Sequence, residues 1–131
     1  MNVRHFKFQS FVDERGSLSV GEFGSHLPFP VRRVYYIYGV GENQRRGFHA
    51  HRKLEQVFFC PSGSCKIMLD DGASKDVVLL DRPDSAIYVG PGIWREMYDF
   101  EPNTVLIVLA SEIYDENDYI RSYDEFMEAV R

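Results

Sequence analysis

The sequence has few cysteines, no long apolar run and no excess of positive charge, and each shortage argues against a class of protein. No stretch approaches the roughly 18 consecutive apolar residues that a membrane-spanning helix requires. The N-terminal segment has no apolar run of signal-peptide length. The formal net charge of −5 argues against nucleic acid or an anionic membrane as a partner. We therefore expect a cytoplasmic protein that binds neither nucleic acid nor membranes.

Only two cysteines are present, Cys60 and Cys65, on either side of the turn-like segment PSGS. This placement makes a disulfide across a hairpin geometrically conceivable. Cysteines in a chain without a secretory signal are usually reduced. We therefore expect two buried free thiols.

The apolar and aromatic content suits one folded core. The chain has 131 residues, of which 44% are hydrophobic and 15% aromatic, so Phe and Tyr should supply much of the buried area. A chain of this length is too short for two ordinary domains. We therefore expect a single domain over residues 1–131.

Short segments with strand-like patterns recur along the chain, separated by turn-forming residues. The separators include DERG, GENQRRG, PSGS, DDGAS and DRPD, whose Gly, Pro, Asn and Asp residues suit turn backbones. The strand-like segments are residues 5–11, 17–23, 32–40, 54–60, 65–71, 75–81, 85–91 and 104–110. Their regular spacing predicts an all-β sandwich or small barrel.

A single helix is predicted at the C-terminus. Apolar residues recur there at steps of three and four, at Ile120, Tyr123, Phe126 or Met127, and Val130. Ser122 with Glu125 forms a capping-box pattern. The expected helix, 122–130, is too short to be stable alone, so its apolar stripe must dock on the sheet or on another subunit.

The most informative stretch is GFHAHRKLEQ, residues 47–56. In an extended strand, residues two apart point to the same side with α-carbons about 6.6 Å apart. His49 and His51 therefore face one space, with Glu55 four residues further on. This spacing permits a metal site, and it equally permits two imidazoles that move a proton on an organic substrate.

Basic residues gather around the histidine pair, although the protein as a whole is acidic. They are Arg32, Arg33, Arg45, Arg46, Arg52 and Lys53. Arginines near such a pair suit a pocket for a small anion such as a phosphate ester. The alternative is a set of solvated charges along strand edges.

The HxHxxxE spacing resembles the first motif of the cupin superfamily, small jelly-roll barrels that often bind a divalent metal through two His and a Glu. A later His completes that metal site. The matching later stretch is YVGPGIWREM, residues 88–97, where Arg95 stands in place of the last ligand. Arginine cannot donate a lone pair to a metal. We therefore expect a cupin jelly roll without metal, while a three-ligand zinc or iron site stays an alternative.

Longer motifs give a more specific resemblance. RGFHAH and DERG are similar to motifs of the dTDP-sugar 3,5-epimerases. A closer resemblance, nearly end to end, is to the dTDP-4-keto-6-deoxyglucose 3,4-ketoisomerases, which are also cupins. It is carried by RGSL, RRVYYIY, RGFHAHRKLEQ, GSCKIMLDDG, YVGPGIWREM and VLIVLASEIYDENDYIRSYDEF.

This resemblance implies an isomerase that takes dTDP-4-keto-6-deoxyglucose as its substrate. It would move the keto group from carbon 4 to carbon 3 through an enediol, without metal or cofactor. The product would lead to a 3-amino-3,6-dideoxyhexose for a surface glycan such as an O-antigen or S-layer glycan. The resemblance leaves open whether the hydroxyl at carbon 4 of the product is axial or equatorial.

The implied catalytic residues are His49 and His51. The reaction needs a base and an acid that exchange roles near neutral pH, which imidazole does best among unperturbed side chains. We expect His51 to be the base at carbon and His49 its partner. The epimerase resemblance implies the reverse order, so both assignments stay open.

The remaining site residues are expected to bind substrate. Arg33 and Tyr35 share one face of a strand, and we expect that face to meet the pocket. Arg46 and Arg15 are candidates for the diphosphate, with Arg15 offered from a second subunit. Gln56 and Arg95 are expected to line the pocket.

Three alternatives to a ketoisomerase remain. They are a dTDP-sugar 3,5-epimerase, a metal-dependent cupin enzyme and a non-catalytic sugar-binding cupin. Jelly rolls often bury an open sheet edge by pairing with a second copy, so we also expect a homodimer.

Overall fold

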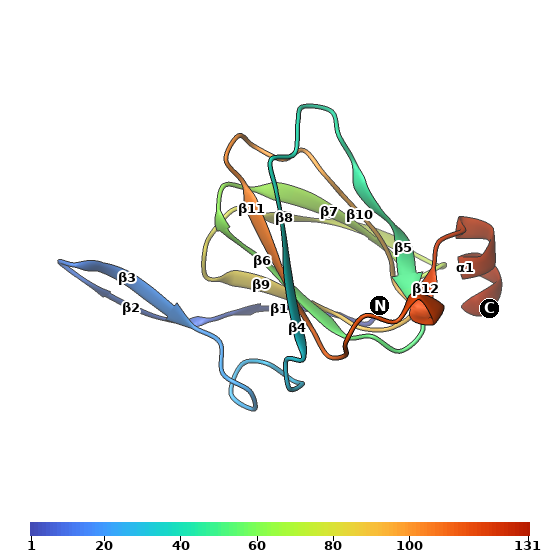
Figure 1. Cartoon of the computed structure of the whole chain (residues 1–131), viewed down its shortest axis with the longest axis horizontal. Helices are drawn as coiled ribbons and strands as arrows, with labels where there is room; N and C mark the ends of the chain where they lie inside the picture. The colour runs from blue at the N-terminus through green and yellow to red at the C-terminus, as the bar shows by residue number, and fades with distance from the viewer.

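Two antiparallel sheets packed face to face make up most of the computed structural model, which describes residues 1–131 (Figure 1). The first sheet has the strand order β1 (Val3–Lys7), β9 (Ser85–Val89), β6 (Gln56–Ser62), β11 (Val105–Ala110), β4 (Arg33–Tyr38). The second has the order β12 (Tyr119–Ile120), β5 (Arg46–His51), β10 (Trp94–Tyr98), β7 (Cys65–Asp70), β8 (Lys75–Leu80). The expected all-β sandwich is confirmed.

Two elements lie outside the sandwich. Strands β2 (Gln9–Asp13) and β3 (Gly16–Val20) pair only with each other, and this hairpin projects from the body on the side opposite β12 (Figure 1). At the other side, a 3₁₀ turn over Glu116–Asp118 leads into β12 and then into helix α1 (Tyr123–Ala129). No helix is long and apolar enough to cross a membrane.

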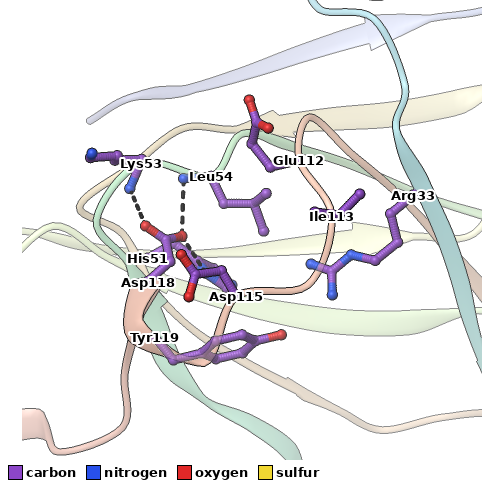
Figure 2. Close-up of a pocket in the computed structure, with 9 residues that line it drawn as sticks. All are labelled: Arg33, His51, Lys53, Leu54, Glu112, Ile113, Asp115, Asp118 and Tyr119. Carbon is purple, nitrogen blue, oxygen red and sulfur yellow. Dashed lines mark hydrogen bonds and ion pairs between the residues drawn. The ribbon is translucent and has the colours of Figure 1, made fainter.

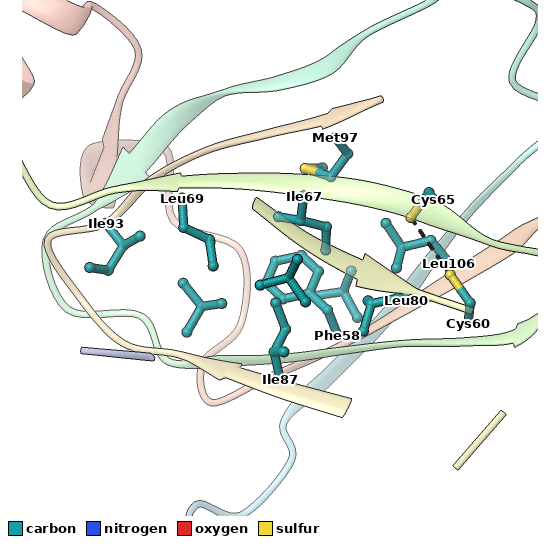
Figure 3. Close-up of a cluster of buried hydrophobic side chains, with 13 residues drawn as sticks. Phe58, Cys60, Cys65, Ile67, Leu69, Leu80, Ile87, Ile93, Met97 and Leu106 are labelled. Carbon is teal, nitrogen blue, oxygen red and sulfur yellow. Dashed lines mark hydrogen bonds between the residues drawn. The ribbon is translucent and has the colours of Figure 1, made fainter. Parts of the chain in front are cut away.

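The space between the sheets is apolar at one end and polar at the other. Alternate residues of β11 and β7 turn inward and join a core of 13 buried side chains drawn from both sheets (Figure 3). Towards one end of the same inner faces the buried residues become His49, His51, Gln56 and Arg95. Cys60 and Cys65 are buried in the apolar core as free thiols, as expected, with their sulfur atoms 3.6 Å apart.

Helix α1 follows its sequence signals closely. The Ser122 side chain accepts a hydrogen bond from the Glu125 backbone N–H at 3.4 Å, which caps the first turn. Phe126 is fully buried against Ala50 and Trp94. The helix therefore docks its apolar stripe on the outer face of the second sheet, one of the two placements expected from the sequence.

One predicted strand had the wrong bounds, and two strands, β10 and the short β12, were not predicted. Residues 5–11 were predicted as one strand, but the chain leaves the first sheet at Phe8. The Phe8 ring packs edge-on against Phe59 at 5.0 Å, and the Phe8 backbone N–H donates to the Asp84 carbonyl. Strand β10 was not predicted at all. Its inward positions are Arg95 and Met97, so a buried charge hides the usual alternation of apolar and polar residues.

Candidate active site

A bulge in β5 aims the histidine pair inward. Pairing between β5 and β10 shifts register so that Phe48 is unpaired, and Gly47 adopts a φ of +99°. A Cβ on Gly47 would lie 2.8 Å from the Arg95 carbonyl oxygen, so only glycine fits this approach. Beyond the bulge His49 and His51 lie on the inner face, with ring centroids 5.0 Å apart.

Each imidazole is held through its Nδ1 atom. His49 Nδ1 donates to the Gly47 carbonyl at 3.0 Å, and His51 Nδ1 donates to the Asp118 carboxylate at 3.1 Å. Both acceptors fix the tautomer that carries hydrogen on Nδ1. The two Nε2 atoms are buried and have no hydrogen-bond partner in the protein. Because such atoms are costly to leave unpaired, they mark a place where a ligand or water supplies the partner.

Asp118 was not identified from the sequence. Its carboxylate also accepts hydrogen bonds from the backbone N–H groups of Lys53 at 2.7 Å and Leu54 at 3.2 Å (Figure 2). It therefore ties the segment after β5 to the 3₁₀ turn and orients His51 at the same time. No local pattern in the acidic segment that follows Ala110 indicates a partner 67 residues away.

Tyr119 was missed for the same reason. Its ring centroid lies 4.4 Å from that of His51 and 5.0 Å from that of His49. The guanidinium carbon of Arg121 lies 4.2 Å from the centroid of the Tyr119 ring. The tyrosine therefore lies against both imidazoles at the mouth of the site, with its hydroxyl directed towards Arg33 (Figure 2).

Arg95 is fully buried beside the histidines and is paired directly with His49 across β10 and β5. Its guanidinium donates to the Ile93 carbonyl from Nε at 3.2 Å and Nη2 at 3.1 Å, and to Gln56 Oε1 from Nη1 at 2.5 Å. All of these acceptors are neutral. Burial lowers the pKa of Arg95 to about 10, so the group keeps an uncompensated positive charge at neutral pH.

The residues of the cupin metal motif do not fit a divalent metal. Glu55 turns away from the histidines, and its carboxylate accepts a hydrogen bond from the Tyr88 hydroxyl at 2.7 Å. Gln56 faces the histidines in its place, and Arg95 brings a positive charge to the position of the last cupin ligand. A divalent cation there would lack its carboxylate ligand and would face the charge of the guanidinium.

Both histidines are neutral near pH 7. Burial, reinforced by the charge of Arg95, lowers the pKa of His49 to about 4 and that of His51 to about 2. A neutral imidazole with a free Nε2 is ready to accept a proton.

This neutrality predicts a loss of stability in mild acid. Below about pH 6.5 the unfolded chain takes up protons on these histidines and the folded chain does not. The free energy of unfolding is therefore unaffected by protonation of these histidines above about pH 6.5. Below it, the free energy of unfolding falls by about 1.4 kcal/mol per pH unit for each histidine as the pH drops towards 4. Urea unfolding between pH 7.5 and 5 measures it. The double variant His49→Asn/His51→Asn should show a shallower dependence, and an unchanged slope would contradict the prediction.

The polar end of the sandwich opens into a cleft between β4 and β5. One part, about 400 Å³, is lined by residues that include Tyr35, Arg46, His49 and Arg121. A second part, about 240 Å³, is lined by residues that include His51, Lys53, Ile113 and Asp118 (Figure 2). Arg33 and Tyr119 line both parts. The Arg33 Nε atom is buried without a hydrogen-bond partner, which suits an anionic ligand.

The structure brings together all but one of the site residues expected from the sequence. Arg33 and Tyr35 lie on the inward face of β4, and Gln56 and Arg95 lie behind the histidines. Arg15 is the exception. It lies at the tip of the projecting hairpin, where its Nη2 pairs with Asp13 at 2.6 Å and its side chain is exposed. Arg15 does not line either part of the cleft, and the β2–β3 hairpin projects from the body on the side opposite β12 (Figure 1).

Fold and site together define a cupin-type sandwich whose cleft combines two neutral imidazoles with unpaired guanidinium groups. Such a site suits proton transfer on an anionic substrate. Over residues 1–131 the chain matches the family described as FdtA: WxcM-like, C-terminal, and it belongs to that family.

Known relatives agree with this placement. The chain is 47% identical over 130 residues to a TDP-4-oxo-6-deoxy-alpha-D-glucose-3,4-oxoisomerase of Aneurinibacillus thermoaerophilus, covering 99% of this chain and 94% of the relative. It also resembles a crystal structure of a mutant 3,4-ketoisomerase QdtA from Thermoanaerobacterium thermosaccharolyticum in complex with TDP-4-keto-6-deoxyglucose. That match has a TM-score of 0.96 and 43% identity, and covers 98% of this chain and 94% of the other. The resemblance to the 3,4-ketoisomerases is therefore confirmed.

The epimerase resemblance extends to the fold alone. The rmlC epimerase of Mycobacterium tuberculosis matches with a TM-score of 0.74 and 23% identity, over 90% of this chain and 67% of the epimerase. This similarity supports the expected cupin fold and carries no argument about the reaction.

Proposed function

We propose that this protein is a dTDP-sugar 3,4-ketoisomerase that moves the keto group of dTDP-4-keto-6-deoxyglucose from carbon 4 to carbon 3. The observation that carries the proposal is the pair of buried Nε2 atoms, on neutral His49 and His51, which have no partner in the protein. Relatives that match nearly the whole chain and have this activity in their names support it. The activity is proposed to need neither metal nor cofactor and to take place in the cytoplasm.

The reaction is a set of balanced proton transfers. A base removes the proton from carbon 3, and the electrons of that C–H bond form a double bond to carbon 4. The carbonyl at carbon 4 thereby becomes an enediolate oxygen, which receives a proton. The hydroxyl at carbon 3 then loses its proton, the carbonyl forms there, and carbon 4 receives a proton. Two adjacent imidazoles can serve both carbons and their oxygens.

Two observations bear on which histidine acts at carbon. The Asp118 carboxylate behind His51 would stabilise the imidazolium that forms when this ring takes a proton, which supports His51 as the base. The pKa of His49, about 4, lies above that of His51, about 2, which supports the reverse order. We assign His51 as the base and His49 as its partner, and isotope exchange decides between the two orders.

The diphosphate is proposed to bind at the arginine-rich part of the cleft. Arg33 and Arg46 line it, and Arg33 has an unpartnered Nε. Arginine matches phosphate oxygens with paired N–H donors. The 3-keto product would then suit an aminotransferase that makes a 3-amino-3,6-dideoxyhexose for a surface glycan.

A homodimer is proposed from the apolar surface that a single chain exposes. The β2–β3 hairpin carries Phe11, Val12 and Leu18 at 56%, 76% and 59% exposure. An isolated two-stranded hairpin is marginally stable in water, so it needs a surface to cover it. Tyr36 and Tyr38 form a second exposed stripe on the outer face of β4, at 60% and 68%. A second copy that accepts the hairpin would bury such surface and bring Arg15 to the cleft of its partner.

This arrangement predicts complementation between two defective chains. Arg15→Ala alone should raise KM for the nucleotide sugar about 10-fold or more, because a charge-assisted contact is lost. Mixed dimers of Arg15→Ala and His51→Asn chains contain one site with both groups intact. Their activity at low substrate should therefore exceed that of either homodimer. Arg82→Ala, which removes another exposed arginine paired with an aspartate in a turn, is the control. No gain on mixing would contradict the shared site.

Proton NMR tests the function directly. The protein, dialysed against chelator, is incubated with dTDP-4-keto-6-deoxyglucose, and the carbonyl position is followed. A 3-keto product supports the proposal, and its coupling at carbon 4 gives the stereochemistry. Exchange at carbons 3 and 5 without carbonyl movement would indicate an epimerase. Activity only with added metal would indicate a metal-dependent enzyme, and binding without turnover would indicate a sugar-binding protein.

A further inference from the structure

Two buried side chains and the partly buried Tyr35 form a hydrogen-bonded chain that runs from one sheet to the other. Arg95 Nη1 of β10 donates to Gln56 Oε1 of β6 at 2.5 Å, and Gln56 Nε2 donates to the Tyr35 hydroxyl of β4 at 3.0 Å. Strand β11 lies between β6 and β4, and its residue level with Gln56 is Ala110. Its small side chain leaves room for Gln56 to reach Tyr35.

Arg95 fixes the donor and the acceptor of each hydrogen bond in this series. A guanidinium can only donate hydrogen bonds, so the Gln56 oxygen must face it and the Gln56 amide nitrogen must face Tyr35. An amide N–H also donates, so the Tyr35 oxygen acts as an acceptor. The hydroxyl hydrogen of Tyr35 therefore remains free, and no protein group accepts it. Tyr35 lines the part of the cleft that contains His49.

We propose that Tyr35 donates this hydrogen bond to the substrate oxygen that becomes negative in the enediolate, and that Gln56 and Arg95 are positioning residues that keep the hydrogen facing the cleft. The inference rests on the proposed ketoisomerase function and assigns the group that stabilises its intermediate. No proton leaves Tyr35. Burial raises the pKa of its hydroxyl, so it stays a neutral donor at neutral pH.

This series of hydrogen bonds also explains why the Arg95 guanidinium lacks a carboxylate partner. A carboxylate beside Arg95 would cancel its charge, whereas neutral Gln56 transmits the polarisation to Tyr35. Hydrogen bonds in a chain strengthen one another in a site of low dielectric constant. A donor held in place before the reaction is most effective when charge develops on the oxygen it faces.

The substitution Gln56→Glu reverses the direction of the second bond. The carboxylate still accepts from Arg95 but cannot donate to Tyr35, so the tyrosine hydrogen turns towards position 56 and away from the substrate. We expect kcat to fall about 100-fold with KM for dTDP-4-keto-6-deoxyglucose little changed, and Tyr35→Phe to cost a similar factor. Because both changes remove the same interaction, the double variant should be no slower than about either single variant.

The double variant separates this role from a structural or purely electrostatic one. If Gln56→Glu costs as much in the Tyr35→Phe background as in the wild type, or costs nothing in the wild type, the proposal is overturned. Should thermal melting show that Gln56→Glu does not fold, Gln56→Met replaces it in the same cycle. The fall in kcat caused by Gln56→Met should again disappear in the Tyr35→Phe background. An equal fall in both backgrounds overturns the proposal.

Failure of the parent function is distinguishable from failure of this inference. The wild-type protein is assayed first by NMR. A wild type that does not move the carbonyl overturns the proposed function and with it the role of Tyr35. A wild-type isomerase whose two substitutions act independently overturns this inference and leaves the proposed function standing.

Discussion

Asparagine at His49 or at His51 is expected to lower kcat for ketoisomerisation by at least about 100-fold, since each change removes a group that exchanges protons with the substrate. The asparagine side-chain amide can still donate to the Gly47 carbonyl or to Asp118, the acceptors that hold the two rings. Binding of dTDP, measured by calorimetry, should therefore change little. Turnover is followed by NMR of the 3-keto product.

Deuterium exchange then assigns the two histidines. In D₂O, the variant that has lost the carbon base should no longer exchange the proton at carbon 3, whereas the variant that keeps it should still do so. We expect the loss in His51→Asn. His5→Asn is the control, because His5 lies exposed on β1. Normal turnover in both active-site variants would contradict the proton-transfer function of the pair.

Arg95→Met is expected to lower kcat about 100-fold and to move the acid limb of the pH profile upward. The guanidinium supplies the charge behind Gln56 and helps to lower the pKa of both histidines, and loss of one such stabilising group typically costs about this factor. In the wild type, activity that needs both histidines neutral is lost only as the pH falls towards the higher of their two pKa values, which is about 4 for His49. Without Arg95 the histidine pKa values rise, so activity should fail at a higher pH.

Stability separates this effect from unfolding. Replacing a buried charge without an anionic partner by an apolar side chain of similar length often leaves a protein no less stable. The melting temperature of Arg95→Met should therefore equal that of the wild type. Arg45→Met is the matched control, because Arg45 lies on the outer face beside β10, paired with Glu96 at 2.7 Å. An acid limb in Arg95→Met that coincides with the wild type would contradict the electrostatic role of the guanidinium.

The sequence predicted those parts of the site that depend on short-range periodicity. Residues two apart in a strand share a face, so spacing alone grouped His49 with His51 and Arg33 with Tyr35. The all-β fold followed from the spacing of strands and turns. The motif resemblance to the 3,4-ketoisomerases extended these groupings to Gln56 and Arg95.

What could not be predicted depends on contacts between distant segments. Asp118 and Tyr119 reach the histidines only because β12 pairs with the end of β5. The acidic segment that contains them has no period that reveals this pairing. Glu55 matched a metal motif in spacing, yet the direction of its side chain is set by Tyr88, which lies on β9.

The attachment of His51 to Asp118 has a consequence for the order in which the protein is completed during synthesis. Every strand of the sandwich except β12 ends by Ala110, so a nascent chain can pair most of both sheets before residue 118 leaves the ribosome. At that stage His51 has no carboxylate behind it, and neither imidazole has the ring of Tyr119 against it. Partly synthesised chains would therefore resemble the finished protein in their sheets while lacking an assembled catalytic centre.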